Sequence, residues 1–265
     1  MLYPVVIQAR LSSTRLPGKV LMPFLNGMSM LEYQYTRLSK FFPTVVIATS
    51  DQISDDPIYE LCLSQSLTCY RGDLNNVMAR LLDAALFVDG SGDRSFFIRV
   101  GGDDPLISPE GISLTMNAHV DLWKSGEEVS MAYSSHDQGL PYGCACESFH
   151  IESYQRVFQS VMSLPDFATK KLYLEHTKPA FLDPSIKLVN ALQTHKVHVP
   201  PSMTHQSTSL SVDYPEDFLF TSYIAQQLVA RYGFLYSHKQ LLSFLTTDLS
   251  AELKINSSLH DGFGE

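Results

Sequence analysis

Short apolar runs alternate with stretches of helical apolar spacing along the first half of the chain. The runs are rich in β-branched and aromatic residues, which is typical of buried strands. We predict such strands at residues 5–7, 44–49, 67–70 and 95–100. Helices are expected between them, over about 29–40, from Asp56 as N-cap, over 75–87 and from about Ser108. This strict alternation predicts an α/β fold with a mostly parallel, doubly wound sheet.

Beyond residue 128 the pattern becomes less regular. Strands are predicted at residues 129–133, 144–149, 186–192 and 207–212. Helices are predicted over 152–163 and 170–180, from Pro215 to about 230, and over about 237–245, before a polar tail. The sequence contains neither an internal repeat nor a low-complexity linker. We therefore interpret the chain as a single domain that carries an irregular insertion at residues 134–206.

Composition narrows the class of protein. The 265 residues are 45% hydrophobic and 18% charged, as in ordinary globular proteins. The net charge of −9 argues against a broad nucleic-acid surface, although a few local cations can still bind a small anion. No apolar run reaches the ~18 residues of a membrane helix, and the first residues do not resemble a signal peptide. The four cysteines form no Cys-x-x-Cys pair, so we expect reduced thiols in a cytoplasmic protein without nucleic-acid or membrane partners.

The loop after the first predicted strand is a candidate ligand site, because ligands of open α/β sheets bind beyond the carboxyl ends of the strands. Residues 8–19 hold Arg10, Arg15 and Lys19 among serine, threonine and glycine. Small residues let backbone N–H groups approach phosphate oxygens, and the cations neutralise the phosphate charge. The segment is not a Walker A sequence, and a solvated basic turn is the alternative interpretation.

Acidic residues follow two other predicted strands. Asp103 lies in the segment GGDDP at residues 101–105, and Asp213 ends the strand at 207–212 and precedes a helix. Such carboxylates suit Mg²⁺, whose coordination shell phosphate and water complete. Either acid alone can instead cap a turn or the following helix. Together with the cationic loop they favour phosphoryl or nucleotidyl transfer, and we predict that Asp103 and Asp213 meet at one Mg²⁺.

The segment QARLSSTRLPGKVL at residues 8–21 closely resembles the signature loop of the SpsF-type spore-coat polysaccharide cytidylyltransferases, which are relatives of CMP-KDO synthetase. A match over this many positions is far more specific than a lone glycine motif. The resemblance covers roughly residues 3–230. Further matching segments are ATS at 48–50 with DDPI at 55–58, YRGD at 70–73 with Val77 and Arg80, RVGGDDPLI at 99–107, and VDYPEDF at 212–218.

This resemblance implies a Rossmann-like nucleotidyltransferase fold that transfers CMP from CTP to a sugar or sugar acid, releases pyrophosphate and serves cell-surface glycan synthesis. The nucleotide-binding half would span about 1–128, the acceptor-binding and metal-completing part about 129–235, and a C-terminal helix and tail 236–265. Dimers are common in such relatives, so a homodimer is also expected. Arg10, Lys19, Asp103 and Asp213 would be catalytic, the two acids as Mg²⁺ ligands. The nucleotide would contact Gln8, Ala9, Arg10, Ser13, Arg15 and Lys19 and be bordered by Arg71, Asp73 and Arg80.

The acceptor half departs from the family's pattern. The family's PDGLDVE stretch is PYGCACE at residues 141–147, so two acids are missing while Glu147 remains. The family's Arg-Glu-His is Leu174-Glu175-His176, and a further family arginine corresponds to Ser209. These changes favour an unusual acceptor over an inactive enzyme, and they leave the identity of the acceptor open. We predict that residues 140–147 and 174–178 line the acceptor site, with Tyr142, Glu147, Glu175 and His176 as its contacts.

Two other functions stay open from the sequence. A glycosyltransferase of related architecture would use Asp103 and Asp104 as metal ligands for a nucleotide-sugar donor, although the loop at 8–19 suits a free triphosphate better. A homologue that binds nucleotide without turnover is the non-enzyme alternative. The preference for CTP over other triphosphates is open as well, because the base would be recognised largely through the backbone.

Overall fold

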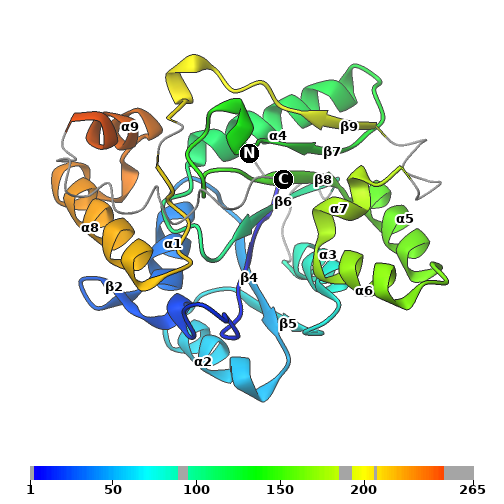
Figure 1. Ribbon diagram of the computed structural model, residues 1–265, viewed down its shortest axis with the longest axis horizontal. Helices are drawn as coiled ribbons and strands as arrows, with labels where there is room; N and C mark the ends of the chain where they lie inside the picture. Colours follow the sequence, from blue (N-terminus) through cyan, green and yellow to red (C-terminus); the bar gives the residue numbers. More distant parts are fainter. Residues whose placement is uncertain (1–2, 89–94, 185–192, 206–207, 248–265) are drawn as a thin grey trace.

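The computed structural model describes residues 3–88, 95–184, 193–205 and 208–247. A seven-stranded sheet runs through its centre in the order β5-β4-β1-β6-β8-β7-β9 (Figure 1). Among these strands only β8 is antiparallel to its neighbours, so the expected mostly parallel sheet is confirmed. From edge to edge the strands are β5 (Cys69–Gly72), β4 (Val45–Ser50), β1 (Val5–Gln8), β6 (Phe96–Gly101), β8 (Glu147–His150), β7 (Val129–Tyr133) and β9 (Gln193–Lys196).

The central strands are buried on both faces, which explains why they read as unbroken apolar runs. Along β1, Val5 and Ile7 point into one core and Val6 into the other, because successive side chains alternate across a strand. Strand β4 repeats this division, with Ile47 in the first core and Val46 in the second. Both faces of the sheet therefore need a covering layer of helices.

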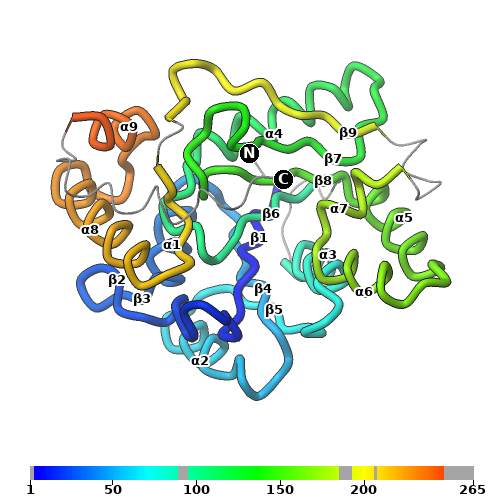
Figure 2. The backbone as a smooth tube through the Cα atoms, in the orientation of Figure 1, coloured from blue at the N-terminus to red at the C-terminus, as the bar shows by residue number. Residues whose placement is uncertain are grey.

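Helices supply those two layers on opposite sides of the sheet (Figures 1 and 2). The face of Val5 and Ile7 packs against α1 (Met30–Leu38), α2 (Asp56–Ser64), α4 (Pro109–Lys124), α8 (Pro215–Tyr232) and α9 (His238–Thr247). The face of Val6 packs against α3 (Val77–Phe87), α5 (Ile151–Met162), α6 (Phe167–Glu175) and α7 (Thr177–Leu182). None of the helices in the described ranges is both long and apolar enough to cross a membrane.

Smaller elements complete the fold. A hairpin of β2 (Pro23–Leu25) and β3 (Met28–Ser29) lies beside α1 and α8, where the Ser222 hydroxyl donates to the Phe24 carbonyl at 2.6 Å. Helix α1 begins at a capping box, in which Ser29 Oγ accepts from the Glu32 N–H and the Glu32 carboxylate accepts from the Ser29 N–H. The 3₁₀ helices are η1 (Lys19–Leu21), η2 (Ile53–Asp55), η3 (His136–Gln138), η5 (Pro201–Met203) and η6 (Gly233–Leu235).

Several predicted elements are corrected by the structure. The helix expected at 170–180 is divided at His176, because Pro179 has no N–H with which to continue α6. The strand expected at 207–212 is wrong: residues 208–212 form no strand, only an isolated bridge between Ser209 and Tyr142. The segment 134–206 is more regular than expected, since it contributes β8 to the middle of the sheet and β9 to its edge. The strand expected at 186–192 and the polar tail lie outside the described residues.

The N-cap predicted at Asp56 is also wrong. Helix α2 begins at Asp56 itself, directly after η2. The Asp56 carboxylate pairs with Arg71 at 2.7 Å instead of capping the helix. The cap predicted near Ser108 is confirmed, because Ser108 Oγ accepts from the Gly111 N–H at 3.1 Å.

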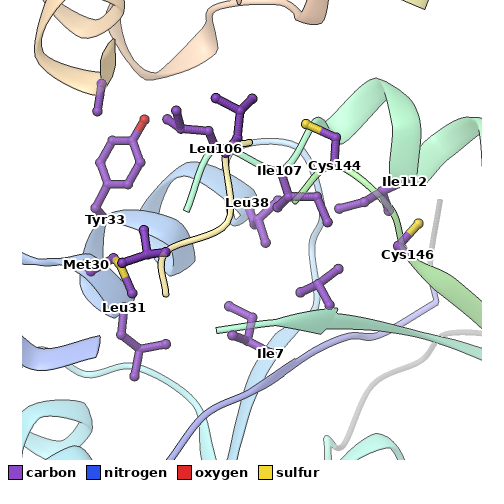
Figure 3. Close-up of a cluster of buried hydrophobic side chains, with 14 of the residues drawn as sticks. Ile7, Met30, Leu31, Tyr33, Leu38, Leu106, Ile107, Ile112, Cys144 and Cys146 are labelled. Atoms are coloured by element: carbon purple, nitrogen blue, oxygen red, sulfur yellow. The ribbon is translucent and has the colours of Figure 1, made fainter. Parts of the chain in front are cut away.

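Two loops that reach the sheet edge are anchored in the first core. Leu106 and Ile107 directly follow residues 101–105, which we call the acidic loop, and pack in this core with Cys144 and Cys146 (Figure 3). The expected reduced thiols are seen, since all four cysteines are free. Burial raises the pKa of Cys144 to about 12 and that of Cys146 to about 11, so both thiols stay protonated and act as apolar packing groups.

Candidate active site

The loops after β1 and β6 touch at the carboxyl edge of the sheet. The two strands are neighbours, with Gln8 in register with Gly101. The Gly102 N–H donates to the Gln8 carbonyl at 2.8 Å. A Cβ on Gly102 would lie 2.8 Å from that same oxygen, so only glycine allows this approach. The cationic loop and the acidic loop are thereby fixed side by side.

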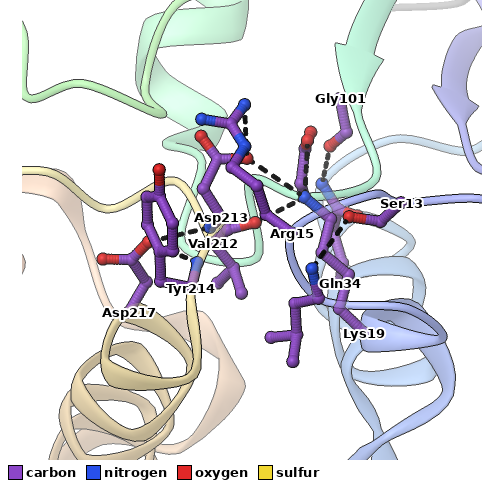
Figure 4. A network of polar contacts seen from close by, with 11 residues as sticks. Ser13, Arg15, Lys19, Gln34, Gly101, Val212, Asp213, Tyr214 and Asp217 are labelled. Carbon is purple, nitrogen blue, oxygen red and sulfur yellow. Dashed lines mark hydrogen bonds and ion pairs between the residues drawn. The ribbon is translucent and has the colours of Figure 1, made fainter. Parts of the chain in front are cut away.

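Lys19 lies at the centre of the site (Figure 4). Its ammonium Nζ is 3.1 Å from Asp103 Oδ2 and 3.5 Å from Asp213 Oδ1, and it also donates to the carbonyl of Val212. Gly18 turns the chain into η1 with φ 73°, a left-handed conformation that favours glycine. Val20 is buried in the first core, so the backbone is anchored directly after Lys19.

Asp213 reaches this site from an irregular segment rather than from the predicted strand. The Val212 N–H donates to the Asp103 carbonyl at 2.8 Å, which joins the two acidic segments directly. The neighbouring acid Asp217 caps α8, because its Oδ2 accepts from the N–H groups of Asp213 and Tyr214, both at 2.8 Å. The capping interpretation of Asp213 is therefore wrong, and its carboxylate faces Lys19.

The acidic loop is held from below by α1. Gln34 Nε2 donates to the carbonyls of Gly101 and Asp104, at 2.8 and 3.0 Å. A Cβ on Gly101 would lie 2.5 Å from an Asp103 oxygen and 2.6 Å from an Asp104 oxygen, so both carboxylates crowd over this glycine. Burial, and then the negative charge of Asp103, raise the pKa of Asp104 well above its usual value. Asp104 therefore holds a proton more readily than an isolated carboxylate would.

Arg15 and Tyr142 border the same acids. Arg15 Nη2 lies 3.4 Å from Asp213 Oδ1, and its guanidinium lies 5.5 Å from the centre of the Tyr214 ring. The hydrogen bond with the Tyr214 side chain is the main reason that the pKa of Arg15 is raised. Burial, followed by the charges of Asp104 and Asp213, raises the pKa of Tyr142. Tyr142, predicted for the acceptor site, thus lies beside the predicted metal ligands.

Arg10 lies apart from this cluster and faces α6. Its Nη1 is 3.6 Å from Glu175 Oε1, and about two fifths of its side chain is exposed. The N–H of the next residue, Leu11, donates to Oδ1 of the fully buried Asp55 at 2.7 Å, and the Ser50 hydroxyl donates to the other oxygen. Asp55 therefore fixes the start of the cationic loop, a role that the sequence did not indicate.

The other residues expected at the nucleotide have varied surroundings. Ala9 is buried at the end of β1, and Ser13 Oγ accepts from the Leu16 N–H at 3.4 Å within the loop. Arg71 is engaged at the end of β4, by the Ser50 and Gln52 carbonyls and by the Asp56 carboxylate. Asp73 Oδ1 accepts from the N–H groups of Asn75 and Asn76, which orders the turn before α3.

Arg80 is almost fully buried, at 1% exposed. Its Nη1 donates to the carbonyls of Asp73 and Leu74, whereas Nε and Nη2 have no hydrogen-bond partner among the described residues. Burial, and then the nearby charge of Arg10, lower the pKa of Arg80. Such a guanidinium has free donors at the predicted nucleotide border, which suits an anionic ligand.

A second cluster of polar side chains lies on the face of the sheet that α6 and α7 cover. On this face the apolar residues Val6, Phe97, Phe149 and Met131 give way, two positions nearer the carboxyl edge of the parallel strands, to polar side chains. On the antiparallel strand β8 that position comes earlier in the chain. We call these side chains the polar row, which consists of Gln8, Arg99, Glu147 and Tyr133.

Glu147 is the centre of the polar row. Its Oε2 accepts from Arg99 Nη1 at 3.2 Å, and its Oε1 lies 3.8 Å from Lys178 Nζ. Arg99 Nε also donates to Gln8 Oε1 at 3.1 Å, and the Lys178 ammonium lies 4.3 Å from the Tyr133 ring centre. Burial opposes the charge of Arg99, but Glu147 and then Asp103 outweigh it and leave the pKa of Arg99 raised. Lys178 lies within the segment 174–178 that was predicted to line the acceptor site, whereas Arg99 was not predicted as a site residue.

The predicted acceptor residues are only partly brought together. Glu147 and Glu175 each pair with a cation, whereas Tyr142 lies at the acids and His176 is exposed at the junction of α6 and α7. Arg10 pairs with Glu175, so the cationic loop reaches the helix that would hold the acceptor.

The two acids around Lys19 fit a magnesium site. Because Nζ lies 3.1 Å from Asp103 Oδ2 and 3.5 Å from Asp213 Oδ1, these oxygens are at most 6.6 Å apart, the sum of the two distances. A cation already lies between them, in the form of the ammonium. Within the described ranges no three His, Cys, Asp or Glu residues gather as a metal site. A pair of carboxylates suits Mg²⁺, which keeps several waters and takes phosphate oxygens as ligands.

The fold and the edge site together define a nucleotidyltransferase with a Rossmann-like architecture. A match to the cytidylyltransferase family covers residues 4–226. The chain therefore belongs to the cytidylyltransferase family, and the resemblance drawn from the loop at 8–21 is confirmed.

Curated relatives agree with this assignment. The spore coat polysaccharide biosynthesis protein SpsF of Bacillus subtilis is 37% identical over 121 residues, which cover 44% of this chain and 49% of that protein. The 3-deoxy-manno-octulosonate cytidylyltransferase of Coxiella burnetii is 33% identical over 117 residues, which cover 42% of this chain and 44% of that enzyme. The chain thus spans about half the length of these two relatives.

Solved structures show the same fold. A cytidylyltransferase from Leptospira borgpetersenii superposes with a TM-score of 0.72 at 22% identity, over 94% of this chain and 95% of that one. A CMP:2-keto-3-deoxy-manno-octonic acid synthetase complexed with CTP gives a TM-score of 0.54 at 16% identity, over 86% of this chain and 99% of that one.

Proposed function

We propose that this chain transfers CMP from CTP to a hydroxyl group of a sugar or sugar acid, for cell-surface glycan synthesis. An acceptor oxygen bonds to the α-phosphorus, the bond from that phosphorus to the bridging oxygen breaks, and pyrophosphate leaves while the hydroxyl proton is released. The observation that carries the proposal is the meeting of Lys19, Asp103 and Asp213 beside a cationic loop, in a chain of the cytidylyltransferase family.

Charge and position account for the chemistry of the nucleotide side. Lys19 and Arg15 place two cations at the acids, and Arg10 adds an exposed cation at the other end of the loop. Such groups neutralise the charge on a triphosphate and hold it for in-line attack. When bound, Mg²⁺ would be held by Asp103 and Asp213 and would supply positive charge to the phosphate oxygens.

The polar row supports the acceptor side of the proposal. Glu147 is 9% exposed in its side chain, whereas Arg99 and Lys178 are each 31% exposed. The buried carboxylate therefore aligns two cations whose outer surfaces are accessible. This arrangement suits an acceptor that carries hydroxyl groups together with an anionic group.

A pyrophosphate-release screen tests the proposed function. Four nucleoside triphosphates are offered with acidic and neutral sugars in the presence of Mg²⁺, and we expect release with CTP and a subset of acceptors. Transfer from a nucleotide-sugar without pyrophosphate release would support the glycosyltransferase instead. Tight CTP binding without release for any acceptor would support a homologue that lacks turnover.

Two further expectations belong to this proposal. A homodimer is testable by light scattering of the purified chain, and a cytoplasmic location by cell fractionation.

A further inference from the structure

Lys19, which is expected to contact phosphate, also contacts the two acids directly. Its side chain is only 8% exposed, and its ammonium has three contacts, with Asp103, Asp213 and the Val212 carbonyl. An ammonium has three N–H donors, so these contacts account for all of them. A metal shared by the two acids would have to lie close to the place that Nζ occupies.

We propose that Lys19 is an internal cation that substitutes for Mg²⁺ at the Asp103–Asp213 pair while nucleotide is absent. The metal then binds tightly only when nucleotide phosphates draw the ammonium away from the carboxylates. This inference rests on the proposed function, because it takes the two acids as metal ligands. It goes further in assigning Lys19 a role before any nucleotide binds.

Electrostatics gives the reason for the exchange. Two carboxylates at most 6.6 Å apart, the sum of their distances to Nζ, repel each other unless a cation lies between them. The ammonium supplies that cation, but a divalent ion beside it would meet a like charge. Phosphate oxygens offer the ammonium an equivalent anion, after which both carboxylates are free for the metal. Nucleotide and metal should therefore bind cooperatively, each favouring the other.

Arg15 is less suited to this role. It also approaches Asp213, at 3.4 Å, but its side chain is 38% exposed and its guanidinium lies against Tyr214. Lys19, by contrast, is held in place between Gly18 and the buried Val20. The geometry thus selects Lys19 as the cation that bridges both acids.

Binding of Mn²⁺ without nucleotide, followed by the electron paramagnetic resonance signal of the free ion, tests the proposal. Lys19→Met keeps the length of the side chain and removes its charge, so this variant should bind Mn²⁺ on the order of 10-fold tighter than the wild type. Mg²⁺ should also raise the melting temperature of Lys19→Met more than that of the wild type. Lys178→Met is the matched control, since it removes a lysine from Glu147, and it should leave Mn²⁺ affinity unchanged.

The outcomes separate this inference from the proposed function. Equal Mn²⁺ affinity in the wild type and in Lys19→Met would overturn it and leave Lys19 as a phosphate ligand alone. Failure of the wild type to bind Mn²⁺ even with CTP present would instead remove the metal assignment itself. If Lys19→Met does not fold, Lys19→Gln keeps a polar end without charge and is expected to show the same gain. In either background, adding Asp103→Asn should abolish that gain.

Discussion

Shared ions organise the site at the scale of single residues. Lys19 serves two carboxylates, and Glu147 serves two cations, so each buried charge is matched by more than one partner. A buried charge left without its partner is strongly unfavourable, whereas a shared one stays compensated when one partner turns to a ligand. Sharing of this kind therefore allows a charged side chain to leave for substrate without exposing an isolated charge.

Asp103 gives a direct test of the metal assignment. Asp103→Asn keeps the shape of the side chain and removes its charge, so kcat/KM should fall by at least ~10²-fold, as for other preorganised charges at phosphate. CTP binding measured without Mg²⁺ should survive, because the cations of the loop remain. Asp121→Asn, at an exposed position of α4, is the control and should retain activity. Loss of folding in Asp103→Asn would indicate a structural role instead.

Lys178 gives the corresponding test of the acceptor side. Lys178→Met should raise the KM for the acceptor on the order of 10-fold, since one of the two accessible cations at Glu147 is lost, while the KM for CTP changes less than about twofold. Lys178→Arg restores the charge and should recover most of the affinity. A parallel rise in both KM values would contradict the assignment. Tyr142 is a poorer probe, because it lies beside Asp103 and Asp213, the proposed metal ligands.

The proximity of charged residues next to strand ends could be predicted, but the groups that position them could not. Lys19, Asp103 and Asp213 each lie in a loop at the sheet edge, so their meeting could be anticipated. The groups that position the site, Gln34 and Asp55, act on loops 67 and 44 residues away in the chain. Nothing in the local pattern around either residue indicates which backbone group it will bind. Lys178 lies within the predicted acceptor segment 174–178, but its pairing with Glu147, 31 residues away in the chain, was not predicted.

At the scale of elements, the carboxyl ends of β1 and β6 and the start of α8 position Lys19, Asp103 and Asp213. Helix α8 begins beside the site because Asp217 binds the two N–H groups that precede it. The capping residue Asp217 and the candidate metal ligand Asp213 are thus four residues apart and have different roles. One carboxylate turns toward the backbone, and the other is left for the site.

Removal of that cap should have two measurable effects. Asp217→Ala should lower the free energy of unfolding by about 1 kcal/mol, as for other caps, and it should also reduce activity because Asp213 loses its backbone support. Glu216→Ala removes the exposed acid next to it and is the control for charge at the helix start. Urea unfolding and pyrophosphate release measure the two effects. Equal losses in both variants would show that the charge, not the hydrogen bonds, stabilises this helix.

Elements of the first half were predicted well because local pattern and tertiary environment agree there. Parallel strands buried on both faces carry unbroken apolar runs, and those four strands were all found. The second half depends more on tertiary contacts. The segment at 208–212 has the apolar content of a strand, but its N–H groups go singly to the loops of Tyr142 and Asp103. The conformation of this segment is therefore determined by its tertiary contacts with the site rather than by its own sequence pattern.

At the scale of the whole molecule, a buried histidine ties a covering helix to the half of the sheet that lies beyond β6. His119 on α4 makes this connection to two strands, with Nε2 2.8 Å from the Val129 carbonyl and Nδ1 2.8 Å from the Ser148 hydroxyl. A carbonyl only accepts, so Nε2 carries the proton and Nδ1 accepts from Ser148 in the neutral ring. The ring is fully buried. Protonation would therefore place an uncompensated charge in the core.

This histidine predicts how stability depends on pH. Burial lowers the pKa of His119 to about 4, against about 6.5 in an unfolded chain. As pH falls below 6.5 the unfolded state takes up a proton that the folded state refuses, so this contribution is fully present above pH 6.5 and is lost as pH falls toward 4. Between pH 7 and pH 5 the loss should be about 2 kcal/mol. Burial lowers the pKa of His238 too, which adds a loss of the same sign. Urea unfolding at pH 7, 6 and 5 measures how the free energy of unfolding depends on pH. His119→Gln should reduce this dependence, whereas the control His176→Gln, at an exposed position, should not. An unchanged slope in His119→Gln would assign the acid sensitivity of the fold to other groups.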